Sequence, residues 1–209
     1  MSKKILILSI LLAFYLTSCI NIRTPSPNIN YYTLEPGEIS KEKFEQLPGA
    51  LKIRKFTISN EYDTEHIIAT RSDNRIKKYF YHRWLNNFSQ MSLDYIINTF
   101  SKNEIFDKGV LESTTYVLPD YILEGHIIEL YAMNDEDEDG DNYVKLSVKY
   151  NFIKRFDEAK DPAIIFNKVF TEKVKRPDNK ARSILKVFNI AMNRITLDLI
   201  KEITRSVKE

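Results

Sequence analysis

The sequence predicts an α+β fold, a two-layer sandwich in which an antiparallel sheet is covered on one face by two helices. Residues 144–152 alternate apolar and polar side chains, as a strand with one buried face does. Two other segments repeat apolar residues at helical spacing. Strands are followed by a helix, more strands and a last helix, without a repeat of fixed period. This order is typical of the α+β class.

Short strands are predicted in the first half of the chain. Residues 31–36 (YYTLEP) are aromatic and β-prone and stop at a proline. Residues 51–58 are β-branched and aromatic but change alternation phase midway, which a β-bulge or an edge strand would explain. Residues 66–71 and 76–81 predict a hairpin with its turn at residues 72–74.

The second half predicts a longer meander around the alternating segment. Residues 105–111 and 121–131 have strand character and precede it, and residues 163–175 follow it. Val144, Leu146, Val148, Tyr150 and Phe152 form the apolar side of the central strand. We therefore expect one face of the sheet to be buried and the other to contact water.

Two amphipathic helices are expected to cover the buried face. Ser89 can cap the first helix, whose apolar side comprises Leu93, Ile96, Ile97 and Phe100. The second helix starts after the sequence RPDN at residues 176–179. Its apolar stripe runs to the C-terminus and contains Ile184, Phe188, Ala191, Met192, Ile195, Leu199 and Ile203. Both stripes need a surface to pack against.

Residues 1–18 are predicted to be a signal peptide. Lys3 and Lys4 precede an apolar run at residues 5–16, and small residues follow it. As a helix this run would reach only ~18 Å, whereas the hydrocarbon core of a bilayer is ~30 Å thick. A permanent membrane span is therefore not expected.

Cys19, the only cysteine, directly follows the signal. The sequence LTSC at residues 16–19 resembles the lipobox of bacterial lipoproteins. The resemblance implies cleavage after Ser18, a diacylglyceryl thioether on Cys19 and an acylated amine, and two or three acyl chains hold a protein firmly on a bilayer. The alternatives are an unmodified cysteine in an uncleaved signal anchor and a buried free thiol.

The mature chain is expected to be a tether followed by one domain. Residues 19–30 contain Pro25 and Pro27 among Asn, Ser and Thr, a composition typical of a flexible tether. Residues 31–209 suffice for a single domain with its own core. Ile20 stands where an aspartate would favour retention at the inner membrane. By resemblance to other lipoproteins this favours the outer membrane, facing the periplasm, and leaves surface display open.

Charge argues against a nucleic-acid partner. The full chain has 31 basic and 29 acidic residues. Without Lys3 and Lys4, 29 basic residues remain, so the mature chain is formally neutral and lacks the basic stripe that nucleic acid requires.

The sequence offers little for catalysis. Apart from Cys19 it has three isolated histidines, His66, His82 and His126, and five glycines. No nucleophile elbow, P-loop or dinucleotide fingerprint can be built from these residues. We expect a protein that is not an enzyme and that has no cofactor and no metal site.

The acidic segment DEDEDGD at residues 135–141 partly matches a calcium loop. Asp135, Asp137, Asp139, Gly140 and Asp141 match EF-hand positions one, three, five, six and seven, but position twelve is a leucine in place of the bidentate glutamate. The flanks are strand-like. The favoured interpretation is a solvated hairpin tip, with weak calcium binding left open.

The aromatic segment KKYFYHRW at residues 77–84 has two interpretations. It can anchor the first helix to the sheet, because aromatic side chains bury a large area. It can also form a partner surface, because Trp, Tyr and Arg dominate the energetic centres of interfaces. The candidate partner-binding residues are Tyr31, Tyr32, Arg83 and Trp84.

The order of features resembles the ABC-type transport auxiliary lipoproteins, the PqiC/YmbA-like family. Its most specific parts are YYTL at residues 31–34 and YHRW at residues 81–84, and it covers nearly the whole mature chain except the acidic segment at 135–141. The resemblance implies a non-catalytic docking component of a lipid transport system. Its partners would be an MCE-domain protein and an ABC transporter or related inner-membrane component, with room for a homo-oligomer. The alternatives are a lipid or small-ligand carrier with a pocket between sheet and helices and a surface adhesin.

Overall fold

The computed structural model describes residues 28–35, 44–71, 73, 75–111, 115–134, 142–155 and 161–208. The predicted signal peptide, Cys19, most of the tether and the acidic segment 135–141 lie outside these residues. The elements, in chain order, are β1 (Asn30–Tyr32), β2 (Leu51–Ile53), β3 (Thr57–Ile58), η1 (Asn60–Tyr62), β4 (His66–Thr70), β5 (Ile76–Trp84), α2 (Phe88–Lys102), β6 (Val110–Leu111), β7 (Tyr121–Met133), β8 (Tyr143–Lys154), β9 (Ala163–Lys175) and α3 (Ala181–Lys208).

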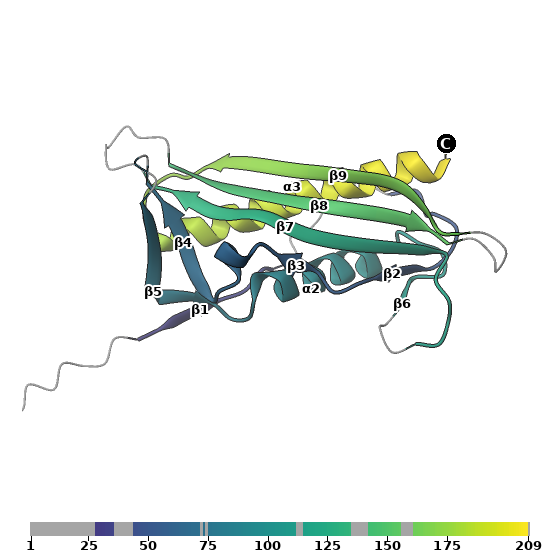
Figure 1. The fold of residues 1–209 in the computed structure, drawn as a ribbon, viewed down its shortest axis with the longest axis horizontal. Coiled ribbons are helices and arrows are strands. Elements are labelled where there is room, and N and C mark those ends of the chain that lie inside the picture. Colours follow the sequence, from purple (N-terminus) through teal and green to yellow (C-terminus); the bar gives the residue numbers. More distant parts are fainter. Residues whose placement is uncertain are drawn as a thin grey trace, which may run out of the picture.

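The structure confirms the α+β class. The nine described strands form one sheet, and Figure 1 shows α2 and α3 on the same side of it, behind the strands in this view. Side chains from both helices and from the facing strands form one hydrophobic cluster. Within the described part of the chain, no helix has both the length and the apolar character needed to cross a membrane.

The sheet is mixed, which corrects the prediction of an antiparallel sheet. The pairs β4–β5, β7–β8 and β8–β9 are antiparallel, whereas β1–β5, β2–β6, β2–β7, β3–β7 and β4–β7 are parallel. The cause is the length of β7. Its thirteen residues pair in succession with β2, β3 and β4 along one edge.

The predicted strand at 51–58 is split between β2 and β3. The chain leaves the sheet at residues 54–56, where the alternation phase changes, and Phe56 turns into the core with 1% of its surface exposed. Its ring lies directly over Gly125 of β7, where a Cβ atom would come within 2.8 Å of the ring. It also meets Tyr150 of β8 edge to face. The absence of a side chain at Gly125 therefore makes room for this crossing.

The alternation predicted for residues 144–152 is confirmed. Val144, Leu146, Val148, Tyr150 and Phe152 are all fully buried on the helix side of β8. On the opposite side, Lys145 binds Glu129 of β7 at 2.8 Å, and Ser147 donates to the same carboxylate. This side therefore carries polar pairs between β7 and β8.

Both predicted helices form, with different starts. The first helix begins at Phe88, and its cap is Asn87, whose side chain accepts from the backbone N–H of Ser89 at 2.9 Å; the predicted cap Ser89 is thus inside the helix. In α3, all seven residues of the predicted stripe are buried. The predicted strand at 105–111 is reduced to β6, and Ile105 and Phe106 are buried in the loop that precedes it.

Candidate interaction surface

Strand β5 is interrupted by an unusually large irregularity. Residues 76–79 pair with β4, and Arg83 pairs with His66, but the next β4 residue, Ile67, pairs with Tyr79. Phe80, Tyr81 and His82 therefore have no residue opposite them on β4. Figure 1 shows β5 bending sharply at this point. Such a bulge redirects the side chains that it contains.

Beyond the bulge, β1 adds to the other side of β5. Asn30, Tyr31 and Tyr32 pair in parallel with His82, Arg83 and Trp84. Among the described residues, the part of β5 from Ile76 to Tyr79 pairs with β4 alone, and Phe80 and Tyr81 pair with no strand. This stretch is an exposed sheet edge, which is the kind of edge that can pair with another chain.

Large apolar side chains gather on this part of the surface. Phe80 is 64% exposed, Tyr81 53% and Tyr31 52%. We call Tyr31, Phe80, Tyr81 and Arg83 the bulge surface. The Nε of Arg83 donates to the carbonyl of Phe80 at 3.2 Å. This hydrogen bond links the two ends of the bulge. Exposed aromatic residues on adjacent strands are candidates for an interaction site.

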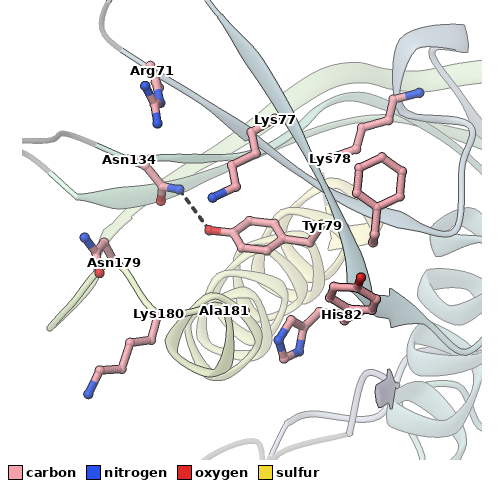
Figure 2. Close-up of a pocket in the computed structure, with 11 residues that line it drawn as sticks. Arg71, Lys77, Lys78, Tyr79, His82, Asn134, Asn179, Lys180 and Ala181 are labelled. Carbon is pink, nitrogen blue, oxygen red and sulfur yellow. Dashed lines mark hydrogen bonds between the residues drawn. The ribbon is translucent and has the colours of Figure 1, made fainter. Parts of the chain in front are cut away.

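A cavity of about 840 Å³ lies between β5 and the start of α3. Figure 2 shows Lys77 and Tyr79 on the side of β5 that faces this helix, with Lys180 on the opposite wall. The hydroxyl of Tyr79 accepts a hydrogen bond from the side-chain amide of Asn134 at 2.9 Å. The cavity is therefore bordered by aromatic and cationic side chains.

Arg176 connects the end of β7 to the start of α3 beside this cavity. Only 2% of it is exposed, and it donates to the carbonyls of Met133 and Lys180 and to the side-chain oxygens of Asn134 and Ser183. Burial lowers the pKa of this guanidinium from its ordinary value. Because Asn134 also binds Tyr79, the chain from Arg176 to Tyr79 fixes the position of the β5 edge. In the sequence, Arg176 gave no signal beyond that of a helix start.

The four candidate partner-binding residues have different environments. Tyr31 is exposed, and Arg83 is half-buried at the bulge. Tyr32 is half-buried, and its hydroxyl lies 2.8 Å from Nδ1 of His82. Trp84 is 2% exposed, so it is not available to a partner. Its ring meets those of Phe88 and Phe188 at 5.0 and 5.7 Å between centroids.

The burial of Trp84 therefore corrects its predicted role in partner binding and agrees with the structural interpretation for this residue. It anchors α2 to β5, as the structural interpretation of KKYFYHRW expected, and it also packs against Phe188 of α3. The exposed aromatic residues of that segment are Phe80 and Tyr81, which were not among the candidates. Sequence alternation could not separate them, because the bulge breaks the period of two on which such assignments depend.

The histidines bind neighbouring side chains and backbone. His66 Nδ1 lies 3.2 Å from the carbonyl oxygen of Tyr79, and His126 Nδ1 lies 2.8 Å from the hydroxyl of Thr57. In the described ranges, no group of three or more His, Cys, Asp or Glu residues is placed to hold a metal ion.

Known proteins are similar to this chain in fold, not in sequence. No protein-family model matches it, and a search of curated proteins found no match. The protein XCC0632 from Xanthomonas campestris, of the family DUF330, superposes with a TM-score of 0.71 at 13% identity, covering 86% of this chain and 97% of that one. The chain thus has the fold of a DUF330 protein.

Two further solved structures have the same fold. An uncharacterized protein superposes with a TM-score of 0.62 at 12% identity, covering 84% of this chain and 99% of the other. The hypothetical protein CT253 from Chlamydia trachomatis gives 0.53 at 9% identity, covering 77% and 98%. Each of these proteins is covered almost completely, so the shared fold is the whole of their described domain.

Proposed function

We propose that this protein is a lipoprotein, anchored through Cys19, that serves as a non-catalytic docking component of an ABC/MCE-type lipid transport system in the bacterial envelope. Its partner would be an MCE-domain protein, and its place the outer membrane, facing the periplasm. The observation that carries the proposal is the bulge surface on a DUF330 fold. DUF330 is the PqiC/YmbA-like family that the sequence features resemble.

The bulge surface suits binding because its residues are held before a partner arrives. Arg83 closes the bulge through the carbonyl of Phe80, and Tyr32 ties β1 to β5 through His82. Tyr31 and Tyr81 are thereby presented from two adjacent strands. A surface that is already ordered loses less conformational entropy on binding.

An acyl anchor would add to the effect of this surface. Cys19 precedes the first described residue, Asn28, by nine residues, a length that can span at most ~30 Å. The domain would then stay close to the bilayer. Confinement near membrane partners raises the effective concentration of the binding surface without any new contact.

The experiment is capture of membrane proteins with the full-length lipidated chain in mild detergent. We expect an MCE-domain protein among the retained proteins, and an affinity at least about tenfold lower for Tyr31→Ser/Tyr81→Ser, because aromatic residues dominate interface energies. Tyr116→Ser is the matched control, since Tyr116 is fully exposed elsewhere on the surface. If the Tyr31→Ser/Tyr81→Ser variant and the Tyr116→Ser control captured equally well, docking at the bulge surface would be contradicted. If no MCE-domain protein were retained, the proposed identity of the partner would be contradicted.

The carrier alternative predicted a pocket between sheet and helices. At that interface the described side chains are closely packed, with Leu146 of β8 and Leu199 of α3 both fully buried. The cavity beside Tyr79 opens instead at the β5 edge. Native mass spectrometry of gently purified protein tests this alternative, because a carrier would retain a phospholipid of defined mass.

A further inference from the structure

The end of β5 that adjoins the β4–β5 turn has a different chemistry from the bulge surface. Residues 71–78 (RSDNRIKK) contain four basic residues and one acidic residue in a mature chain that is formally neutral. Arg71, Arg75, Ile76, Lys77 and Lys78 line an open cavity of about 810 Å³ that Phe80 also borders. We call these five residues the hairpin surface.

One carboxylate of the described residues, that of Asp73, binds Arg75 of the hairpin surface. The carboxylate of Asp73 accepts hydrogen bonds from the backbone N–H and from Nε of Arg75. The backbone bond is the main reason that the pKa of Asp73 lies below its usual value, so this group stays ionised and offsets one arginine. No carboxylate lines either cavity at β5 among the described residues. The described side chains that line these cavities thus include several cations and no carboxylate.

The cations lie on both sides of the edge strand. Lys77 points toward α3, with its Nζ 5.1 Å from the centre of the Tyr79 ring, and Figure 2 shows Lys78 on the other side of β5. Ile76 is 65% exposed and Phe80 64%. Strand alternation places Ile76 on the side of Lys78, and Phe80 borders the same cavity as these two residues. Cations interspersed with exposed apolar side chains are typical of surfaces that bind anionic membranes.

We propose that the hairpin surface contacts the headgroups of anionic phospholipids in the bilayer to which the protein is anchored. A free phosphate would satisfy the cations, but it would leave Ile76 and Phe80 without a partner. The tether also favours a bilayer, because β1 pairs with β5 from His82 onward and only eight residues lie between Cys19 and Asn28. The inference rests on the proposed lipidation of Cys19 but not on the proposed protein partner.

The experiment compares amide hydrogen exchange of the full-length lipidated chain on two kinds of vesicle, phosphatidylcholine alone and phosphatidylcholine with phosphatidylglycerol. We expect slower exchange at residues 76–81 on the vesicles that contain phosphatidylglycerol, and loss of this difference at high salt. Lys77→Gln/Lys78→Gln should abolish it, because each cation near an anionic surface changes binding about fivefold. Lys186→Gln/Lys201→Gln removes two exposed lysines of α3 and should leave the difference intact.

Each other outcome has a distinct meaning. Binding to both vesicles with equal exchange at residues 76–81 would overturn this inference and leave the anchor standing. A chain that fails to bind neutral vesicles would overturn the anchor at Cys19, and the inference with it. Equal protection by inorganic phosphate without vesicles would assign the hairpin surface to a soluble anion. Protection by a captured protein partner, but not by phosphatidylglycerol, would assign it to the protein interface. Either of these last two results would overturn the bilayer contact.

Discussion

Arg176 connects three elements that are distant in the sequence. Its guanidinium lies at the end of β9 and donates to the end of β7 and to the first turn of α3. The sequence predicted that a helix would start after residues 176–179, and α3 begins at Ala181, but it could not predict that the arginine would be buried. Nothing in the residue type distinguishes a buried guanidinium from an exposed one. Its four acceptors come together only in the folded chain.

We expect Arg176→Ala to lower the free energy of unfolding by about 3 kcal/mol, because two carbonyls and the Asn134 side chain would lose a charged donor in a buried place. Urea denaturation measures the change. Arg182→Ala, an exposed residue of the first turn of α3, should change the free energy by less than about 0.5 kcal/mol. A similar small loss for Arg176→Ala would show that water replaces the arginine.

Trp84 gives a second prediction at this scale. Its ring is enclosed by Phe88 and Phe188, so Trp84→Ala should lower the free energy of unfolding by about 3–5 kcal/mol. Any loss of partner capture by this variant would then accompany unfolding. Circular dichroism of the variant during heating measures the effect. A variant as stable as the wild type, with capture lost, would restore Trp84 as a contact residue.

The elements were predictable in proportion to the regularity of their pattern. The alternation of β8 and the stripe of α3 follow one period from end to end, and both were correctly predicted. β5 was predicted to end at Tyr81, whereas it continues through the bulge to Trp84. A bulge depends on the pairing strand, β4, and on β1 from elsewhere in the chain. The bulge surface could therefore not be assigned from local sequence.

The polar side of the β7–β8 ladder provides a pH-dependent test. Partial burial alone would raise the pKa of Glu129, but hydrogen bonds from Lys145 and Ser147 outweigh it and hold the pKa below its usual value. A depressed pKa means that the ionised group stabilises the fold above its unfolded pKa of about 4.3 and that this contribution disappears as the pH falls.

We therefore expect Glu129→Gln to destabilise the protein at neutral pH by up to about 1 kcal/mol, since the pair with Lys145 is partly exposed. The difference from the wild type should shrink as the pH falls below about 4. Urea titrations at a series of pH values measure it. Glu61→Gln, an exposed residue of η1, serves as the control. A difference that grows toward acidic pH would contradict the assigned role of the ion pair.

At the scale of the whole molecule, the sequence predicted the class and the layers but not the strand directions. A pattern of apolar residues shows which face of a strand is buried, and it is the same for parallel and antiparallel neighbours. Three short strands, β2, β3 and β4, run parallel to one edge of β7. That arrangement depends on which strands, distant in the sequence, become neighbours in the sheet. A local sequence pattern does not contain this information.

The single hydrophobic cluster predicts cooperative unfolding. Trp84 is the only tryptophan, and it lies where β5, α2 and α3 meet. We expect its fluorescence and the far-ultraviolet circular dichroism to change at the same urea concentration, because one core joins both helices to the sheet. Two separated midpoints would mean that the β5 end unfolds independently of β8 and β9.

The length of α3 offers a way to measure how the domain is oriented relative to the bilayer of the proposed anchor. Its 28 residues span ~42 Å, starting beside β5 and ending at the opposite end of the molecule (Figure 1). A fluorophore attached at the C-terminus would therefore stand far from the point where β1 joins the domain. For a chain anchored to a bilayer as proposed, energy transfer from that fluorophore to an acceptor dye in the lipid would distinguish an upright molecule from one lying flat.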